Sequence, residues 1–194
     1  MIRLDYEIIT DIIESGAKVL DLGCGDGELL TLLKEKKGCR GTGIEISDTE
    51  VVNAIERGVS VSHGDIDRDL DVYDNGRFDY VILNESLQQV LNIEKVLDEA
   101  LRIGKRVIVG VPNFCQVNAR WQIFFRGRVP VTSSLPYKWY NTPNLRFLSL
   151  NDFRSFCTEK RVKVERARYL FQGKEVFLFP NLFADAGIFV LRKI

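Results

Sequence analysis

The chain has 194 residues, of which 45% are hydrophobic and 28% are charged, and this composition excludes a disordered or low-complexity chain. Lys plus Arg and Asp plus Glu both number 27, so the formal net charge is zero. This balance gives no general basis for binding nucleic acid or a membrane surface, although it leaves a local basic patch open. No apolar run approaches the roughly 20 residues that are needed to span a bilayer.

The cysteines and the start of the chain indicate an intracellular protein. Four cysteines, at positions 24, 39, 115 and 157, form neither a C-x-x-C pair nor a zinc-ligand spacing. The first five residues, Met1 to Asp5, do not resemble a secretory signal. We therefore expect free thiols, no metal site and a cytoplasmic location.

The first part of the chain predicts two strands that each end on an acid. A helix with apolar residues on one face is closed by Ser15-Gly16, and a strand follows at 18–22. A glycine turn comes next, and a leucine-rich helix runs from it to about Lys37. The short strand 41–45 then finishes on Glu45.

The middle of the chain continues this alternation of strands and helices. Ser47 and Glu50 form a capping box that opens a helix, and Gly58 lies just past its end. An amphipathic helix begins near Ile93 and stops at Gly104. Further strands are expected at 59–62, 78–83 and 106–111, and the second of these leads into Asn84.

After strand 106–111 the alternation gives way to an aromatic insertion at about 113–147. It is predicted to hold a helix over roughly 115–126 and then an irregular loop rich in aromatic and basic residues. We expect this segment to be a lid, part of the core or a partner surface rather than a platform that stacks nucleotides. A helix start at 149–152 and two long strands, about 162–171 and 186–193, complete the chain.

This order of elements predicts the fold class. Strands that alternate with helices indicate an α/β fold, here a Rossmann-like, doubly wound and mostly parallel sheet of seven strands. The two successive strands at the end of the chain indicate an antiparallel edge strand. Because no internal repeat or break in composition divides the chain, we expect one domain over residues 1–194.

The glycine turn after the first strand indicates which ligand the fold would bind. A dinucleotide site needs the spacing G-x-G-x-x-G, whereas this chain has Gly23-x-Gly25-x-Gly27 and carries Glu28 at the last glycine position. Asp26 and Glu28 would place two carboxylates beside a pyrophosphate, which is unfavourable. A ligand with a sulfonium and an ammonium group has no such disadvantage, so the turn favours S-adenosylmethionine over NAD.

Residues Val19 to Gly27, with Glu45 at the end of the next strand, resemble the first motif of class I S-adenosylmethionine-dependent methyltransferases. The resemblance covers about residues 15 to 112 and implies that family's fold, with the ligand between the first and fourth strands. It implies that Asp21 lies near the methionine part of the cofactor and that Glu45 accepts hydrogen bonds from the ribose hydroxyls. The binding residues it implies for S-adenosylmethionine or S-adenosylhomocysteine are Asp21, Gly23, Cys24, Gly25, Gly27, Glu45, Ile46, Asp65, Ile66 and Asn84.

Each of these assignments has a structural alternative. The glycine turn is also compatible with simple turn geometry, and Glu45 with an ordinary charge at a strand end. Asp65 matches the residue that reads the adenine amino group, but it could merely cap its turn. Asn84 matches the residue nearest the methyl group. His63, the only histidine, is expected to face solvent or cap a turn rather than act in catalysis.

The whole chain also resembles a narrower family, the methionine biosynthesis protein MetW family. The resemblance rests on the short lead-in to the glycine turn, on the segment 109–114, on Trp121 with Gly127-Arg128, and above all on the segment 135–144. It implies a methyltransferase-like protein that is linked to methionine synthesis through homoserine O-acyltransferase. It therefore implies a partner or activator of that enzyme, and it leaves methyl transfer unproven.

The residues after the fourth strand identify no catalytic group. Transfer to oxygen or nitrogen usually needs a positioned base, and residues 84–89 contain no histidine and only one carboxylate, Glu85. Tyr137 and Tyr140 could border a substrate pocket, but nothing in the sequence orients them. The lead-in before the first strand is also expected to be too short to build a large lid.

Two hypotheses follow from this combination. The first is a regulatory protein that binds S-adenosylmethionine and acts on an acyltransferase of methionine synthesis. The second is a small-molecule methyltransferase whose base is Glu85 or a tyrosine of the aromatic insertion. A nucleic-acid methyltransferase is disfavoured because the net charge is zero and no Asn-Pro-Pro-aromatic motif is present.

Overall fold

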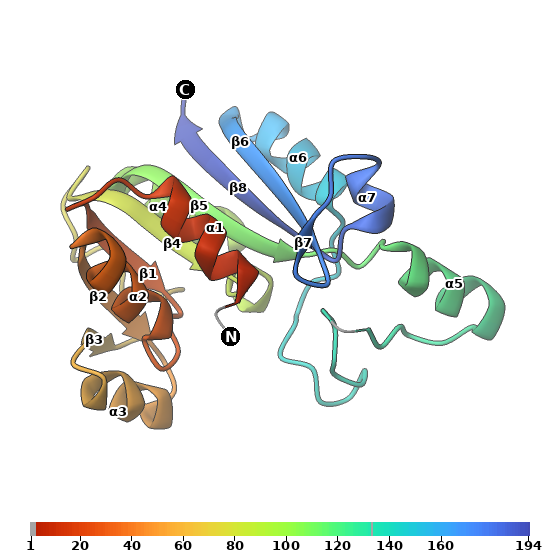
Figure 1. The fold of residues 1–194 in the computed structure, drawn as a ribbon, viewed down its shortest axis with the longest axis horizontal. Helices are drawn as coiled ribbons and strands as arrows, with labels where there is room; N and C mark the ends of the chain where they lie inside the picture. The colour runs from red at the N-terminus through yellow and green to blue at the C-terminus, as the bar shows by residue number, and fades with distance from the viewer. Residues whose placement is uncertain (1–2, 133) are drawn as a thin grey trace.

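A computed structural model describes residues 3–132 and 134–194, and these residues are built around one eight-stranded sheet (Figure 1). The strands are β1 (Lys18–Leu22), β2 (Arg40–Glu45), β3 (Ser60–His63), β4 (Phe78–Asn84), β5 (Gly104–Pro112), β6 (Val162–Phe171), β7 (Lys174–Glu175) and β8 (Ala186–Lys193). The helices are α1 (Leu4–Ile12), α2 (Glu28–Lys37), α3 (Asp48–Glu56), α4 (Ile93–Ile103), α5 (Val117–Arg126), α6 (Leu150–Glu159) and α7 (Pro180–Phe183), with a 3-10 turn η1 (Leu87–Gln89).

The topology confirms the predicted fold class. The strand order is β3-β2-β1-β4-β5-β8-β6-β7. Strands β1 to β5 pair in parallel, and β8 pairs antiparallel with both β5 and β6. The order reverses between β1 and β4, so the carboxyl ends of these strands border the crevice where doubly wound sheets bind ligands. The two-residue strand β7 adds an eighth strand to the expected seven, because it extends β6 by a tight turn.

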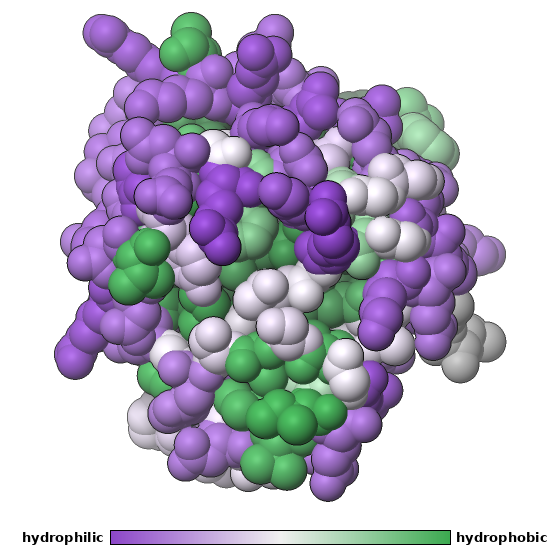
Figure 2. Space-filling view, turned by 90° about the vertical axis from the view of Figure 1, so that its left-hand side faces the viewer, coloured by the Kyte–Doolittle hydropathy of each residue, from purple (hydrophilic) through white to green (hydrophobic). Residues whose placement is uncertain are grey.

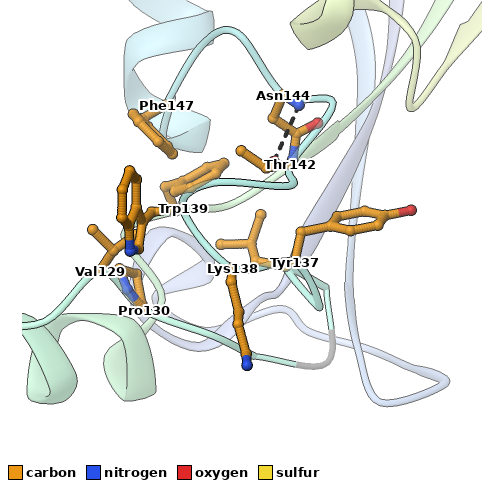
Figure 3. A pocket seen from close by; sticks show the side chains of 10 residues that line it. Val129, Pro130, Tyr137, Lys138, Trp139, Thr142, Asn144 and Phe147 are labelled. Atoms are coloured by element: carbon orange, nitrogen blue, oxygen red, sulfur yellow. Dashed lines mark hydrogen bonds between the residues drawn. The ribbon is translucent and has the colours of Figure 1, made fainter.

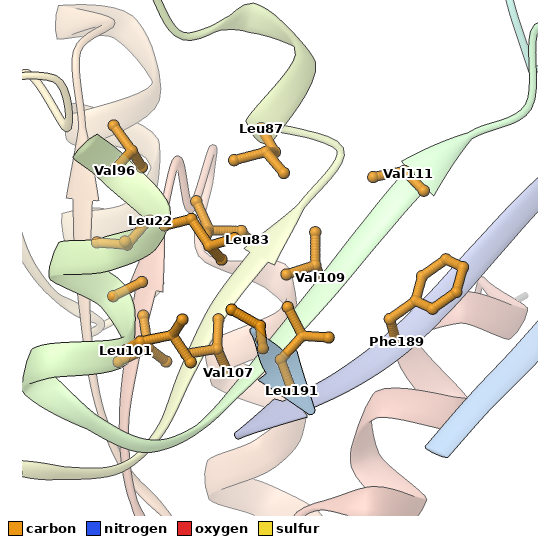
Figure 4. Packing of buried hydrophobic residues seen from close by; sticks show 14 of the residues in the cluster. Leu22, Leu83, Leu87, Val96, Leu101, Val107, Val109, Val111, Phe189 and Leu191 are labelled. Atoms are coloured by element: carbon orange, nitrogen blue, oxygen red, sulfur yellow. The ribbon is translucent and has the colours of Figure 1, made fainter. Parts of the chain in front are cut away.

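Two apolar layers cover the two faces of the sheet. Successive residues of a buried parallel strand point to opposite faces, so Leu83 and Val109 contribute to one layer while Ile82 and Ile108 contribute to the other. Helices α4 and α6 pack on the first layer, which also contains the fully buried Phe189 (Figure 4). Helices α1 and α2 pack on the second layer.

Most predicted elements have the expected positions, and the differences lie at their ends. Strands β1, β6 and β8 match their predicted ranges, and Ser47 accepts a hydrogen bond from the Glu50 amide as the cap of α3. Helix α1 ends at Ile12 rather than at Ser15. Helix α5 begins at Val117 rather than 115, because the Gln116 side chain accepts hydrogen bonds from the Asn118 and Ala119 amides.

The aromatic insertion leaves the body of the sheet. Helix α5 and the loop after it extend away from the strands (Figure 1), and Ala119 is the buried residue of α5. At the opposite end of the molecule, the space-filling view shows an apolar patch at the level of α3 (Figure 2), where Val52 and Ile55 are exposed. Within the described residues, no helix combines the length and the hydrophobicity that crossing a membrane requires.

The cap of α6 offers a direct test of the fold. The Ser149 hydroxyl accepts a hydrogen bond from the Asp152 amide at 3.1 Å, and the Asp152 carboxylate accepts one from the Ser149 amide at 2.9 Å. We expect Ser149→Ala to lower the free energy of unfolding in urea by about 1 kcal/mol, because Ala leaves the helix amide unpaired. Ser149→Thr keeps the hydroxyl and serves as the control. Equal losses for both substitutions would contradict the capping role.

Candidate cofactor-binding site

Three glycines shape the turn between β1 and α2. Gly23, Gly25 and Gly27 have φ angles of 80°, 53° and 76°, in the left-handed region that residues with a side chain rarely adopt. Gly23 also lies against the segment after β4, since a Cβ there would be 2.9 Å from the Ser86 Cβ. The turn therefore depends on glycine for its dihedral angles and for its close contact with Ser86.

Glu45, the last residue of β2, is fixed by backbone amides. Its Oε2 accepts a hydrogen bond from the Gly25 amide at 2.8 Å. Its Oε1 accepts hydrogen bonds from the Ile46 amide at 2.9 Å and from the Ser47 amide at 3.0 Å. A carboxylate has about four acceptor sites, and the three amides use both sites of Oε1 and one of Oε2. The clamped group therefore keeps acceptor capacity on Oε2 for a hydroxyl donor of a diol.

A groove of about 410 Å³ opens beside Glu45 and the turn, within the usual range of small-molecule pockets of about 300–1,000 Å³. Four separate segments of the chain and Leu145 of the aromatic insertion line it. The lining residues are Gly23, Gly25, Ile44, Glu45, Ile46, Gly64, Asp65, Ile66, Asp67, Ser86, Gln89, Val90, Leu91 and Leu145. Six of the ten residues that the sequence pointed to are therefore brought together, namely Gly23, Gly25, Glu45, Ile46, Asp65 and Ile66.

The other four predicted residues lie next to the groove rather than in its lining. Gly27 packs against α3 and β3, since a Cβ there would be 2.9 Å from Val59 Cγ2. Cys24 packs over β2, where a Cβ on Gly43 would be 2.3 Å from the Cys24 Sγ. Burial raises the pKa of the Cys24 thiol to about 12, so Cys24 is a packing residue in this state and not a nucleophile.

Asp21 is the buried acid of the site. It is only 3% exposed and lies one residue from the end of β1. Burial, and next the charge of Glu45, raise the pKa of the Asp21 carboxyl from 3.8 to about 7. A cation beside Asp21 would favour its charged form and lower this pKa. The site therefore combines one fixed carboxylate with a second that titrates near neutrality.

Asn84, at the end of β4, is covered by the start of the chain. Its Nδ2 donates a hydrogen bond to Asp5 Oδ2 at 2.8 Å, and Arg3 Nη2 donates to the same carboxylate at 2.7 Å. Arg3 also bonds to Glu85 Oε2 at 2.9 Å. The Asn84 Oδ1 atom is buried and has no hydrogen-bond partner within the described chain. Although short, the lead-in thus reaches over the end of β4, which its length alone did not indicate.

Several lining residues were missed by reasoning from the sequence. Asp67 holds the wall of the groove by accepting hydrogen bonds from the Leu91 and Asn92 amides at 2.8 and 2.9 Å. Ser86 has a buried hydroxyl oxygen without a partner in the described chain, and Leu145 comes from the aromatic insertion. The polar run after β4 was the one signal in the sequence, since it contains Ser86 and Gln89.

His63 takes the structural position that we expected. Its side chain is 56% exposed, and its Nε2 lies 2.9 Å from the carbonyl oxygen of Ile46. It does not line the groove. His63 therefore braces the backbone behind Ile46 and offers no base to the site.

A second cavity, of about 320 Å³, adjoins the groove and shares Gln89 with it. Arg3, Glu85 and Gln88 line it together with Tyr137 of the aromatic insertion. Glu85 has a φ of 59°, which is strained for a residue with a side chain. Because its carboxylate is paired with Arg3, Glu85 could act as a base only after this pair opens.

The raised pKa of Asp21 predicts a pH effect on stability. Between about pH 4 and pH 7 the unfolded chain releases this proton while the folded chain keeps it, so the free energy of unfolding falls as the pH rises. Asp21→Asn removes this charge. We therefore expect the stability of the Asn variant relative to the original chain, measured in urea, to be greater at about pH 8 than at about pH 5.

Asp74→Asn is the matched control, because the Asp74 side chain is 91% exposed. It should leave the difference in stability nearly the same at both values of pH. If Asp21→Asn behaved in the same way, the assignment of a buried, neutral Asp21 would be wrong.

Comparisons with known proteins agree with this geometry. The family described as "Methionine biosynthesis protein MetW" matches residues 3–191. The bifunctional methionine biosynthesis protein MetXA/MetW of Rhodopirellula baltica is 32% identical over 205 residues, which include 99% of this chain. The chain spans only about a third of that protein, as the match covers 33% of its length.

More distant relatives share the fold. A demethylmenaquinone methyltransferase of Shouchella clausii is 25% identical over 175 residues, covering 78% of this chain and 72% of that protein. The crystal structure of a SAM-dependent methyltransferase from Thermotoga maritima, described as a possible histamine N-methyltransferase, superposes with a TM-score of 0.69 at 18% identity. The superposition covers 98% of this chain and 88% of the Thermotoga maritima protein. The chain therefore has the class I methyltransferase fold and belongs to the MetW family of methionine biosynthesis proteins.

Proposed function

We propose that the chain is an S-adenosylmethionine-binding, methyltransferase-like component of methionine biosynthesis that acts with, or regulates, a homoserine O-acyltransferase in the cytoplasm. In this proposal residues 1–194 form one cofactor-binding domain. The observation that carries it is the Glu45 carboxylate, clamped by three backbone amides in a groove beside the glycine turn.

The groove suits S-adenosylmethionine or S-adenosylhomocysteine in size and chemistry. Glu45 offers acceptor capacity on its carboxylate for the ribose hydroxyls, and Ile66 and Leu91 offer apolar side chains for the adenine ring. Asp21 would provide negative charge once a sulfonium or an ammonium beside it favours its charged form. S-adenosylmethionine would supply an electrophilic methyl group. The chain's own residues would bind and orient it, with Asn84 and Asp5 at the methionine end.

The partner is inferred from the family and from one relative. The resemblance to the MetW family implies homoserine O-acyltransferase, and the relative from Rhodopirellula baltica is a bifunctional MetXA/MetW protein in which the matched part is 33% of the length. Two functions that are joined in one chain in one organism commonly act together as separate chains in another. This argument supports a partnership and not a particular reaction of the MetW part.

A small-molecule methyltransferase is the second candidate. It is favoured by the cavity next to the groove, where Glu85 and Tyr137 could border a methyl acceptor. Against it, Glu85 is engaged by Arg3 at 2.9 Å, and the site contains no histidine. Incubation of the purified protein with S-adenosylmethionine and a cell extract separates the two candidates, because an enzyme would form S-adenosylhomocysteine at a rate that the Glu85→Gln variant lacks.

The cofactor proposal predicts that Glu45→Ala weakens S-adenosylmethionine binding, measured by calorimetry. Loss of a hydrogen bond to a charged group costs roughly 1.5–3 kcal/mol, so the dissociation constant should rise about 10- to 150-fold. Glu45→Gln keeps one acceptor oxygen and should have a smaller effect. Glu56→Ala, at the exposed end of α3, is the control and should bind as the original chain does. Unchanged affinity in Glu45→Ala would refute the ribose assignment.

The partnership predicts a change in acyltransferase activity. We expect the purified homoserine O-acyltransferase of the same organism to bind this chain and to change its rate when the chain is added. The measurement is made with and without S-adenosylmethionine, because a regulator that senses the cofactor should act differently in the two cases. If the enzyme neither bound the chain nor changed its rate in either condition, the proposed function would be lost.

A further inference from the structure

The aromatic insertion exposes an unusual set of large apolar side chains. We define the aromatic face as Trp121, Phe124, Phe125, Trp139 and Tyr140, which come from α5 and from the loop that follows it. Their exposed fractions are 49%, 81%, 67%, 73% and 63%. Exposed aromatic side chains that gather in this way mark an interaction site, because solvent contact with each ring is unfavourable.

The segment around this face is strongly basic although the chain as a whole is neutral. Residues 113–147 contain five cations and no carboxylate. Two of the cations lie on rings of the aromatic face, with Arg126 at 4.9 Å from the Trp121 ring centroid and Lys138 at 5.8 Å from that of Tyr140. Exposed rings from both α5 and the loop therefore have a cation beside them. An acidic surface with an apolar centre would complement it.

The loop is fastened to α5 and packed internally. Gln122 Nε2 donates a hydrogen bond to the Val131 carbonyl oxygen at 3.0 Å, and the Val131 amide donates to Gln122 Oε1 at 3.2 Å. Trp139 lies with Val129, Pro130 and Phe147 around one small hollow (Figure 3). The face is thus preformed, and docking would need little ordering of the loop.

The same loop reaches the cofactor groove. Leu145 lines the groove, and its amide donates a hydrogen bond to the Gln88 carbonyl oxygen at 3.0 Å. Arg146 Nη2 donates to the Leu91 carbonyl oxygen at 2.8 Å. Gln88 and Leu91 flank the wall of the groove after β4. A single segment therefore forms part of the groove at one end and carries the aromatic face at the other.

We propose that the aromatic face is the surface on which the homoserine O-acyltransferase docks, through an apolar patch of the enzyme that is bordered by carboxylates. This inference rests on the proposed function and adds the place of contact. A partner protein is favoured because the Rhodopirellula baltica relative joins MetXA and MetW in one protein. A second copy of this chain is disfavoured because it would bring two basic, acid-free segments together.

The test measures the affinity of the purified acyltransferase for the original full chain and for four variants of it. Trp139→Ala and Phe124→Ala should each weaken binding at least tenfold, since exposed aromatic residues at the centre of an interface dominate its affinity. Arg126→Glu should weaken it and reduce its dependence on salt. Val52→Ala is the matched control, because Val52 is a 54% exposed apolar residue on α3, outside the aromatic face.

S-adenosylmethionine affinity is measured on the same variants. It should stay unchanged in Trp139→Ala and Phe124→Ala, because neither residue lines the groove, and this also establishes that the variants are folded. If the original chain does not bind the acyltransferase at all, the proposed function itself fails. If the original chain binds and Trp139→Ala, Phe124→Ala and Arg126→Glu all leave its affinity unchanged, only the docking inference is overturned.

Parallel measurements test two other occupants of the aromatic face, a membrane surface and a second copy of this chain. Binding of the original chain to vesicles of phosphatidylcholine and phosphatidylglycerol, lost in Trp139→Ala while acyltransferase affinity is kept, would overturn the inference in favour of a membrane surface. A dimer in solution that Trp139→Ala converts to a monomer, again with acyltransferase affinity kept, would overturn it in favour of self-association. Loss of acyltransferase binding in the variants, with no binding to vesicles, supports it.

Discussion

The carboxylate of Glu45 is the interaction on which the site depends. It accepts hydrogen bonds from one amide of the glycine turn and from two amides that lead into α3. In this way one side chain joins the end of β2 to the turn after β1. Bonds from amides to a charged acceptor are stronger than bonds between neutral groups. The floor of the groove is therefore held by a carboxylate that also lines it.

This arrangement has an electrostatic consequence for Asp21. Asp21 is buried under the turn, and this burial, followed by the charge of Glu45, raises the pKa of Asp21 and so the cost of charging it. A neutral or anionic ligand would do nothing to relieve that cost. A cationic ligand with a vicinal diol would relieve it and would also satisfy Glu45, so the two acids together select for one kind of molecule.

The sequence predicted the parts of the structure that depend on local signals. Strand β1, the glycine turn and Glu45 follow from an apolar run, a spacing and a strand end, and all are close in the chain. The residues that were missed reach the groove through tertiary contacts. Ser86 can approach the turn because Gly23 has no side chain, and Leu145 is held at the groove by the hydrogen bond from its amide to the Gln88 carbonyl. Neither contact leaves a periodic pattern in the sequence.

Strand β7 and the contacts made by the start of the chain were missed for a related reason. Strand β7 has two residues and no period of its own, so it exists only because β6 offers it an edge. The start of the chain was also underestimated. Arg3 and Asp5 are long or charged enough to bond with Asn84 and Glu85 at the end of β4.

The zero net charge of the whole chain concealed a basic segment, residues 113–147. A zero net charge is an average, and here it combines an acidic remainder with a segment, 113–147, that has five cations and no acid. Helix α5 has Ala119 as its buried residue, and its three aromatic side chains, Trp121, Phe124 and Phe125, are exposed rather than packed in the core. Their exposure beside Arg126 and Lys138 is what led us to propose a partner surface here. The segment also lines the groove through Leu145, so a partner on its outer face would bind the same segment that forms part of the groove wall.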